Sequence, residues 1–223
     1  MASRNAQPNP FDEPALASRY EAWYAGEGRR ADVLEKALLG KLLDRFSDAR
    51  SILEVGCGTG HFTRWMMDRG LAAVGADVSG PMLNEARRAG GPGYVPGDAC
   101  SLPFAARSFD LTALITALEF LPDPLRALSE AIRVARQGVL LGVLNRWSLL
   151  ALRHRFFGKA LWRCARFYGP RELTELVRQA AGSRVKAVVW QTTLWPIPGM
   201  RELALPWGGF IGMAVQLNKE SSV

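Results

Sequence analysis

An apolar run that leads into three glycines is the sequence feature that most restricts the fold of this chain. Residues 52–55 are strand-like, glycines follow at alternate positions (Gly56, Gly58 and Gly60), and a helix-compatible segment begins at Phe62. Glycine permits a tight turn and a close backbone approach to a ligand, and free N–H groups at the start of the next helix can bind polar atoms. Such a unit is typical of nucleotide-like cofactor sites, although a plain strand-to-helix turn also fits.

Short apolar runs alternate with amphipathic segments along most of the chain. The runs predict strands at 51–55, 72–76, 94–95, 109–115, 139–144, 185–193 and 209–217, and the segments predict helices over 62–69, 81–89, 125–135 and 171–181. This alternation predicts a doubly wound, mostly parallel sheet of seven strands with helices on both faces. The last two strands are joined by a Pro/Gly-rich connection, which favours an antiparallel pair at the sheet edge.

The chain has 223 residues and is 48% hydrophobic, which suits one α/β domain over residues 1–223. Helical spacing of leucines predicts an N-terminal helical cap over residues 11–46. Three cysteines without CxxC spacing and only two histidines indicate no disulfide framework and no metal site. No apolar run reaches the roughly 18 residues of a membrane span, so we expect a soluble, cytoplasmic protein.

Glycine spacing separates two cofactor families. A dinucleotide fingerprint needs a small residue at position 61, where this chain has His61, so a nicotinamide oxidoreductase is disfavoured. Residues 54–60 instead resemble motif I of the class I S-adenosylmethionine-dependent methyltransferases. Asp77 ends the second predicted strand, where an acid can accept both ribose hydroxyl protons or can cap the next helix.

Two later segments carry the same resemblance. Residues 81–83 resemble the family's Ser-x-x-Met-Leu signature, in which Met82 packs on adenine, and a core methionine is the alternative. Residues 97–104 with 108–110 resemble the adenine-binding loop and fourth strand of the family. There the Asp98 carboxylate accepts from the exocyclic amino group and the Ala99 N–H donates to a ring nitrogen, although Gly-Asp alone is more often a turn.

The resemblance covers residues 35–181 and is nearest to the small-molecule branch that includes ubiquinone and menaquinone methyltransferases. It implies a Rossmann-like fold, S-adenosylmethionine as cofactor, and a small or lipophilic acceptor, and the basic segment 146–171 adds an anionic acceptor as an alternative. The cofactor-binding residues that it implies are Tyr20, Glu54, Gly56, Cys57, Gly58, Gly60, Asp77, Val78, Met82, Asp98, Ala99 and Glu119. Methyl transfer from a sulfonium is an in-line displacement, so alignment and desolvation can supply most of the acceleration.

Glu119 is the candidate catalytic residue, because it follows the fourth predicted strand where relatives often have a histidine-containing segment. Three roles fit this position. Glu119 can act as a general base toward the substrate, bind the amino end of the cofactor, or be purely structural. Asn145, at the end of the fifth predicted strand, is either a further polar group of the site or a helix cap. In the cap, Tyr20, Trp23 and Tyr24 either close over the cofactor as a lid or pack on the domain.

A basic, aromatic-rich insertion follows the fifth predicted strand, over residues 146–170. From Arg146 to Arg171 the chain has seven Lys/Arg and no acid, which equals its whole net charge of +7. Four roles fit this insertion: a substrate lid, a contact with acidic lipid headgroups, a nucleic-acid contact or a packed helix pair. Nucleic-acid binding is the least favoured of the three functional roles, because no separate binding module is visible. The rival to an enzyme is a non-catalytic S-adenosylmethionine-binding protein that uses residues 146–171 to bind a membrane surface or a partner. The oligomeric state is left open.

Overall fold

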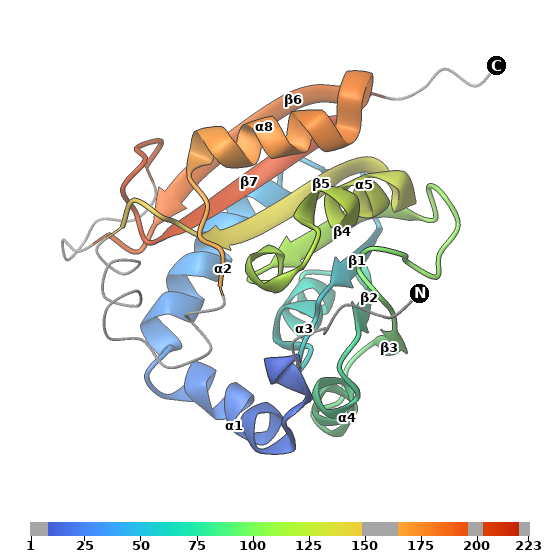
Figure 1. The fold of residues 1–223 in the computed structure, drawn as a ribbon, viewed down its shortest axis with the longest axis vertical. Coiled ribbons are helices and arrows are strands. Elements are labelled where there is room, and N and C mark those ends of the chain that lie inside the picture. The colour runs from blue at the N-terminus through green and yellow to red at the C-terminus, as the bar shows by residue number, and fades with distance from the viewer. Residues whose placement is uncertain (1–8, 149–164, 196–202, 219–223) are drawn as a thin grey trace, which may run out of the picture.

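A single seven-stranded sheet organises the computed structural model, which describes residues 9–148, 165–195 and 203–218 (Figure 1). Its strands are β1 (Ser51–Val55), β2 (Ala72–Asp77), β3 (Gly93–Pro96), β4 (Phe109–Ile115), β5 (Ala135–Leu144), β6 (Val185–Thr193) and β7 (Phe210–Leu217). They lie in the order β3-β2-β1-β4-β5-β7-β6. Strands β1 to β5 are parallel, and β7 runs antiparallel to both β5 and β6, as the sequence predicts.

Helices cover both faces of the sheet. They are η1 (Pro10–Asp12), α1 (Pro14–Ala25), α2 (Arg29–Leu43), α3 (His61–Asp68), α4 (Gly80–Arg88), η2 (Leu118–Phe120), α5 (Pro124–Val134), α8 (Pro170–Ala181) and η3 (Gly182–Arg184). On one face α2 and α3 bury Leu38 and Met66 against the sheet, and on the other α5 and α8 lie side by side and bury Leu128 and Val177 (Figure 1). The two hydrophobic layers fix the strand ends from which the site is built.

Local sequence signals explain where the helices start. The Ser79 hydroxyl accepts a hydrogen bond from the Met82 N–H at 3.3 Å and caps α4. The Asp123 carboxylate accepts from the Arg126 N–H at 3.0 Å and caps α5. Proline stands in the first turn of both helices, where its missing N–H costs no hydrogen bond.

Strand β5 begins at Ala135 and not at residue 139 as predicted, because α5 passes into the strand without a loop. Ala135 already pairs with Phe109 of β4, and the Arg136 guanidinium forms an ion pair with Asp110 at 3.0 Å. These first residues of the strand lack the apolar run that marks a buried strand, so the sequence pattern does not report them.

The C-terminal antiparallel pair is confirmed, with β6 at the edge and β7 one place inside it. Helix α2 packs closely on β7: a Cβ at Gly212 would lie 2.7 Å from the Leu42 side chain and 2.9 Å from that of Leu38. No helix in the described part of the chain is both long and apolar enough to cross a membrane.

Candidate functional site

The glycine turn after β1 presents one open side. Gly56, Gly58 and Gly60 all have positive φ, at +73°, +53° and +74°, which is the region that favours glycine. A Cβ at Gly56 would lie 2.6 Å from that of Ala117, and one at Gly60 would lie 2.4 Å from the Tyr94 hydroxyl oxygen. At Gly58 a Cβ would meet no atom within 4 Å. Gly56 and Gly60 therefore have to be glycine because a side chain there would collide with other parts of the protein. At Gly58 the space is open, so a ligand can approach the backbone at this point.

Asp77 joins this turn to the turn after the neighbouring strand β2. One carboxylate oxygen accepts from the Gly58 N–H and the other from the Ser79 N–H, each at 2.8 Å. Burial raises the pKa of Asp77, and the two N–H donors oppose that shift. A carboxylate has about four acceptor positions, so Asp77 keeps capacity for a further hydroxyl donor. The next side chain, Val78, is 66% exposed, whereas Met82 is 1% exposed and lies in the core.

Glu54 and Cys57 support the turn from behind. The Glu54 carboxylate accepts a hydrogen bond from the Thr63 hydroxyl on α3, and burial raises the pKa of Glu54 to about 8. Cys57 is buried, which raises the pKa of its thiol. Glu54 thus joins β1 to α3, whereas the Cys57 side chain lies against Gly75 of β2.

The Asp98 loop lies at the same end of the sheet. The Gly97 N–H donates to the Asp77 carbonyl at 2.9 Å, which attaches the loop to the end of β2. Asp98 is exposed, and one of its carboxylate oxygens accepts from the Cys100 N–H at 2.8 Å. Ala99 is buried beside it. The structure therefore brings Gly58, Asp77 and Asp98 to neighbouring strand ends.

Glu119 lies at the ends of β4 and β5. It is 2% exposed; its Oε1 accepts from the Leu144 N–H at 2.7 Å, and its Oε2 has no hydrogen-bond partner. Burial raises the pKa of Glu119 to about 7. Close by, Thr116 has φ of +49°, an unusual conformation for a β-branched residue, and its N–H donates to the Gly142 carbonyl at 2.7 Å. Strained backbone and an unpaired carboxylate oxygen at one strand end are typical of functional sites.

The N-terminal cap crosses these strand ends. The Ser79 hydroxyl donates to the Phe11 carbonyl at 2.7 Å, and the Phe11 ring packs edge-on against Phe120 at 4.9 Å and Tyr20 at 6.3 Å between ring centroids. Burial raises the pKa of Tyr20 to about 12, and its hydroxyl interacts with that of Thr116. Tyr20 thus lies over the end of β4, while Trp23 is 42% exposed. Of the two roles expected for these aromatics, the structure shows packing at Tyr20, and closing over the cofactor stays a prediction.

Glu21 of α1 attaches the cap to the glycine turn. Its carboxylate accepts from the Thr59 hydroxyl at 2.7 Å and forms an ion pair with Arg64 of α3. Burial opposes ionisation of Glu21, but hydrogen bonds from His61 and Thr59 and the charge of Arg64 together lower its pKa to about 2.

His61 makes the second attachment. Its ring stacks on Tyr24 of α1 with centroids 3.7 Å apart, and its Nε2 lies 2.7 Å from Asp32 Oδ1 of α2. The Lys36 ammonium lies 2.8 Å from the same ring nitrogen and forms an ion pair with Asp32 at 3.0 Å. The residue that departs from the dinucleotide pattern therefore binds both cap helices to the start of α3.

Three features of the site were missed by sequence reasoning: Thr116, the Glu21–His61 attachment and Glu35. Glu35 of α2 is 5% exposed, and burial and the charges of Asp32 and Glu119 raise its pKa to about 8. A signal for Glu35 exists in the sequence, because it stands three and four residues before Leu38 and Leu39 on the apolar face of α2. The other two depend on contacts between distant segments.

The basic insertion is described only at its ends, and residues 149–164 of the predicted lid lie outside the described residues. Arg146 and Arg166 both pair with Glu172 of α8, at 2.9 and 3.1 Å. Asn145 donates to the Pro206 and Gly208 carbonyls at 2.6 and 2.7 Å, so it connects β5 to the segment before β7.

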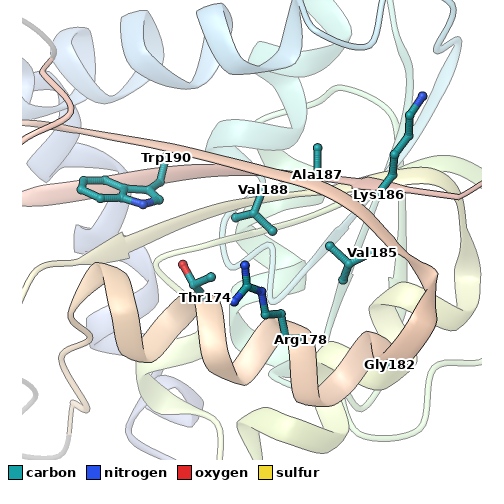
Figure 2. Close-up of a pocket in the computed structure, with 8 residues that line it drawn as sticks. All are labelled: Thr174, Arg178, Gly182, Val185, Lys186, Ala187, Val188 and Trp190. Carbon is teal, nitrogen blue, oxygen red and sulfur yellow. The ribbon is translucent and has the colours of Figure 1, made fainter.

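A separate groove lies between α8 and the edge strand β6, with a volume of about 520 Å³. Figure 2 shows Thr174 and Arg178 of α8 across from Val185, Val188 and Trp190. Strands β4, β5 and β7 separate it from β1, so it takes no part in the glycine-turn site. Within residues 9–148, 165–195 and 203–218, no three His, Cys, Asp or Glu side chains gather in a way that could hold a metal ion.

Comparison with known proteins agrees with this geometry. A family model described as a methyltransferase domain matches residues 53–143. The chain is 36% identical over 139 residues to a malonyl-[acyl-carrier protein] O-methyltransferase of Salmonella typhimurium, covering 62% of this chain and 53% of that protein. It is 38% identical over 88 residues to a demethylmenaquinone methyltransferase of Renibacterium salmoninarum, covering 39% and 37%. The chain thus spans about half the length or less of these two relatives.

A crystal structure from Thermotoga maritima is similar over nearly the whole chain. It is described as an SAM-dependent methyltransferase, possible histamine N-methyltransferase, and it matches with a TM-score of 0.77 and 27% identity over 91% of this chain and 96% of that one. The sheet order and the glycine turn with an acid at the next strand end define a Rossmann-like cofactor-binding protein. These matches support a class I S-adenosylmethionine-dependent methyltransferase, with the methyltransferase domain matched over residues 53–143.

Proposed function

We propose that the protein transfers a methyl group from S-adenosylmethionine to a small-molecule acceptor by in-line displacement. The observation that carries this proposal is the open side of Gly58 beside Asp77, since the corresponding positions at Gly56 and Gly60 are occupied by Ala117 and Tyr94. The match to a methyltransferase domain over residues 53–143 and the similar Thermotoga structure support the same donor.

The residues fit the adenosyl group in a specific way. Asp77 keeps acceptor capacity for a ribose hydroxyl, and the exposed Val78 offers an apolar surface beside it. The Asp98 carboxylate is proposed to accept a hydrogen bond from the exocyclic amino group of adenine, and the Ala99 N–H to donate one to a ring nitrogen. Met82 is too deeply buried to offer adenine much surface, so its burial favours the core role. Glu54 and Cys57 support the turn rather than face the ligand.

When bound, S-adenosylmethionine supplies a methyl group on an already activated carbon. The chain has to align the acceptor with that carbon and keep water out. Tyr20 and Phe11 lie across the strand ends where this would occur, and the Glu21 and His61 contacts hold them there. We therefore assign the cap to covering the bound ligands, and Glu119 to the acceptor side at the ends of β4 and β5.

The acceptor is proposed to be a small molecule. The relatives named above act on different acceptors, a malonyl thioester carrier and a demethylmenaquinone, and the Thermotoga protein is a possible histamine N-methyltransferase. An anionic acceptor was expected from the basic insertion, but Arg146 and Arg166 already share Glu172. The described part of the insertion gives no support for an anion site.

Calorimetric titration with S-adenosylhomocysteine tests the donor site. Asp77→Ala is expected to weaken binding by about 10- to 100-fold, because hydrogen bonds to a charged group contribute about 1.5–3 kcal/mol. Asp68→Ala, which removes an exposed acid at the end of α3, is the matched control and is expected to bind normally. Circular dichroism confirms that each variant is folded before titration. Equal affinity in the two variants, or no binding by the unmodified protein at millimolar ligand, would refute the proposal.

A further inference from the structure

Two buried carboxyl groups lie under the cap on the acceptor side of the site. Glu35 of α2 is 5% exposed and Glu119 of η2 is 2% exposed. Burial raises the pKa of Glu35 to about 8 and that of Glu119 to about 7, and the charges of Asp32 and Glu119 add to the shift at Glu35. Two buried acids are costly to ionise together, and a cation bound between them would stabilise both ionised forms.

One carboxylate oxygen of Glu119 is available to bind a ligand. Its Oε1 is fixed by the Leu144 N–H at 2.7 Å, while Oε2 is buried and has no hydrogen-bond partner. An unpaired buried carboxylate oxygen costs free energy of about 1–3 kcal/mol or more, so its persistence requires an explanation. A ligand donor that binds there would remove that cost.

The Lys36 ammonium, which is the cation that acts on Glu35, pairs with Asp32 instead. Lys36 lowers the pKa of Glu35, but its Nζ lies 3.0 Å from Asp32 and 2.8 Å from the His61 ring, in the attachment of the cap to α3. Lys36 therefore neutralises Asp32 and leaves the charge of Glu35 to be met from the site.

Aromatic rings complete the surroundings of the two acids. The Tyr20 and Tyr24 rings lie edge to face with centroids 5.9 Å apart, and the charges of Glu35 and Glu119 both raise the pKa of Tyr20. Charge from Glu35 also raises the pKa of Tyr24. Carboxylates beside aromatic rings form a common recognition site for an ammonium group.

We propose that Glu35 and Glu119 bind the protonated amino group of the methyl acceptor, so that the acceptor is an amine. This inference rests on the proposed methyl-transfer function and names its substrate class. Glu119 Oε2 accepts one N–H of the ammonium, and the Glu35 carboxylate accepts a second. The Tyr20 and Tyr24 rings cover the carbon atoms next to the nitrogen.

The same pair prepares the amine for transfer. A carboxylate oxygen of Glu35 takes one ammonium proton and becomes a carboxylic acid, and the nitrogen regains its lone pair. That lone pair forms the new N–CH₃ bond while the C–S bond of the donor breaks and its electrons remain on sulfur. The methylated product is an ammonium ion, and the Glu35 proton leaves to water when the cap opens. No further reactant is needed.

The first experiment uses the unmodified protein loaded with S-adenosylhomocysteine. Phenethylamine, histamine and tryptamine are compared with the alcohol and carboxylic acid of the same skeleton, by thermal shift and by calorimetry. At least one amine is expected to raise the melting temperature and to bind, while its alcohol and acid do not. In turnover assays with radiolabelled S-adenosylmethionine, the label is expected on the same amine only.

The second experiment compares Glu35→Gln with Glu27→Gln, a matched change at an exposed acid of the same cap. Glu35→Gln is expected to lower kcat/KM for the amine by about tenfold or more and to abolish the amine-induced thermal shift. Its affinity for S-adenosylhomocysteine is expected to stay within about twofold of the unmodified protein. Glu27→Gln is expected to change none of the three.

Different failures point to different proposals. If the unmodified protein does not bind S-adenosylhomocysteine, the proposed function fails and this inference with it. If it binds that ligand but no amine, or accepts alcohols or acids equally well, only the amine site is refuted. Weakened S-adenosylhomocysteine binding in Glu35→Gln would assign the acid to the cofactor instead and would also overturn the inference. The comparison of amine with alcohol does not depend on how the variant folds.

Discussion

Replacing Gly58 with alanine should separate ligand binding from folding at the glycine turn. Gly58 has φ of +53°, and a Cβ there would meet no protein atom within 4 Å. Gly70, after the end of α3, offers a matched control, because its φ is +88° and a Cβ there also meets nothing within 4 Å. The two substitutions therefore impose similar backbone strain, and only the first adds a methyl group where the cofactor is expected.

The magnitudes follow from the two environments. Alanine in the left-handed region costs about 1–2 kcal/mol, so both variants should lose about that much free energy of unfolding. In Gly58→Ala the new methyl also displaces the ligand from the turn and from Asp77. Loss of one hydrogen bond to a charged group, about 1.5–3 kcal/mol, corresponds to roughly 10- to 100-fold weaker binding.

Urea unfolding measures the stability of each variant, and calorimetric titration with S-adenosylhomocysteine measures binding under conditions where both are folded. The expected result is equal stability with a large difference in affinity. If Gly58→Ala and Gly70→Ala bind S-adenosylhomocysteine equally well, the open side of the turn is not the ligand site. A third variant, Gly60→Ala, should be less stable than either, because its Cβ would lie 2.4 Å from the Tyr94 hydroxyl.

Two further predictions concern the buried acids and the cap. The pKa of Glu119 is raised to about 7 in the folded protein, so the folded state keeps a proton that the unfolded state loses. The free energy of unfolding should then fall as the pH rises from about 4.5 to 7, by up to about 3 kcal/mol from this group. In urea unfolding, Glu119→Gln should make that pH dependence weaker. An unchanged pH dependence in the variant would contradict the burial argument. Glu21→Gln, which breaks the contacts to Thr59 and Arg64, should speed tryptic cleavage in the cap relative to Glu27→Gln. Equal cleavage rates would show that Glu21 does not hold the cap down.

The sheet was predictable because its strands are buried and its helices are amphipathic, so each element carries its own periodic signal. The glycine spacing also located the turn, but it could not distinguish Gly58 from Gly56 and Gly60. That difference depends on Ala117, which follows β4, and on Tyr94 of β3, both distant from the turn in sequence.

The cap contacts were not predictable in the same way. Glu21 and His61 are 40 residues apart, and neither lies in a pattern that indicates a partner. Glu35 is an intermediate case, since an acid on the leucine face of α2 signals a buried charge without naming what it meets. Sequence periodicity reports which face of an element is buried, and the partner of a polar group follows only from the tertiary arrangement.

The position of β7 has a consequence for how the protein is made. This strand comes last among those described, yet it lies inside the sheet between β5 and β6 and carries the packing surface for α2. Until residues 210–217 have left the ribosome, one edge of β5 therefore stays unpaired. The leucines of α2 also lack part of the surface on which they pack in the folded protein. Pairings of such large sequence separation form slowly, and open strand edges invite association with other chains. Completion of this sheet is thus a late event that exposes the nascent chain to aggregation until β7 is inserted.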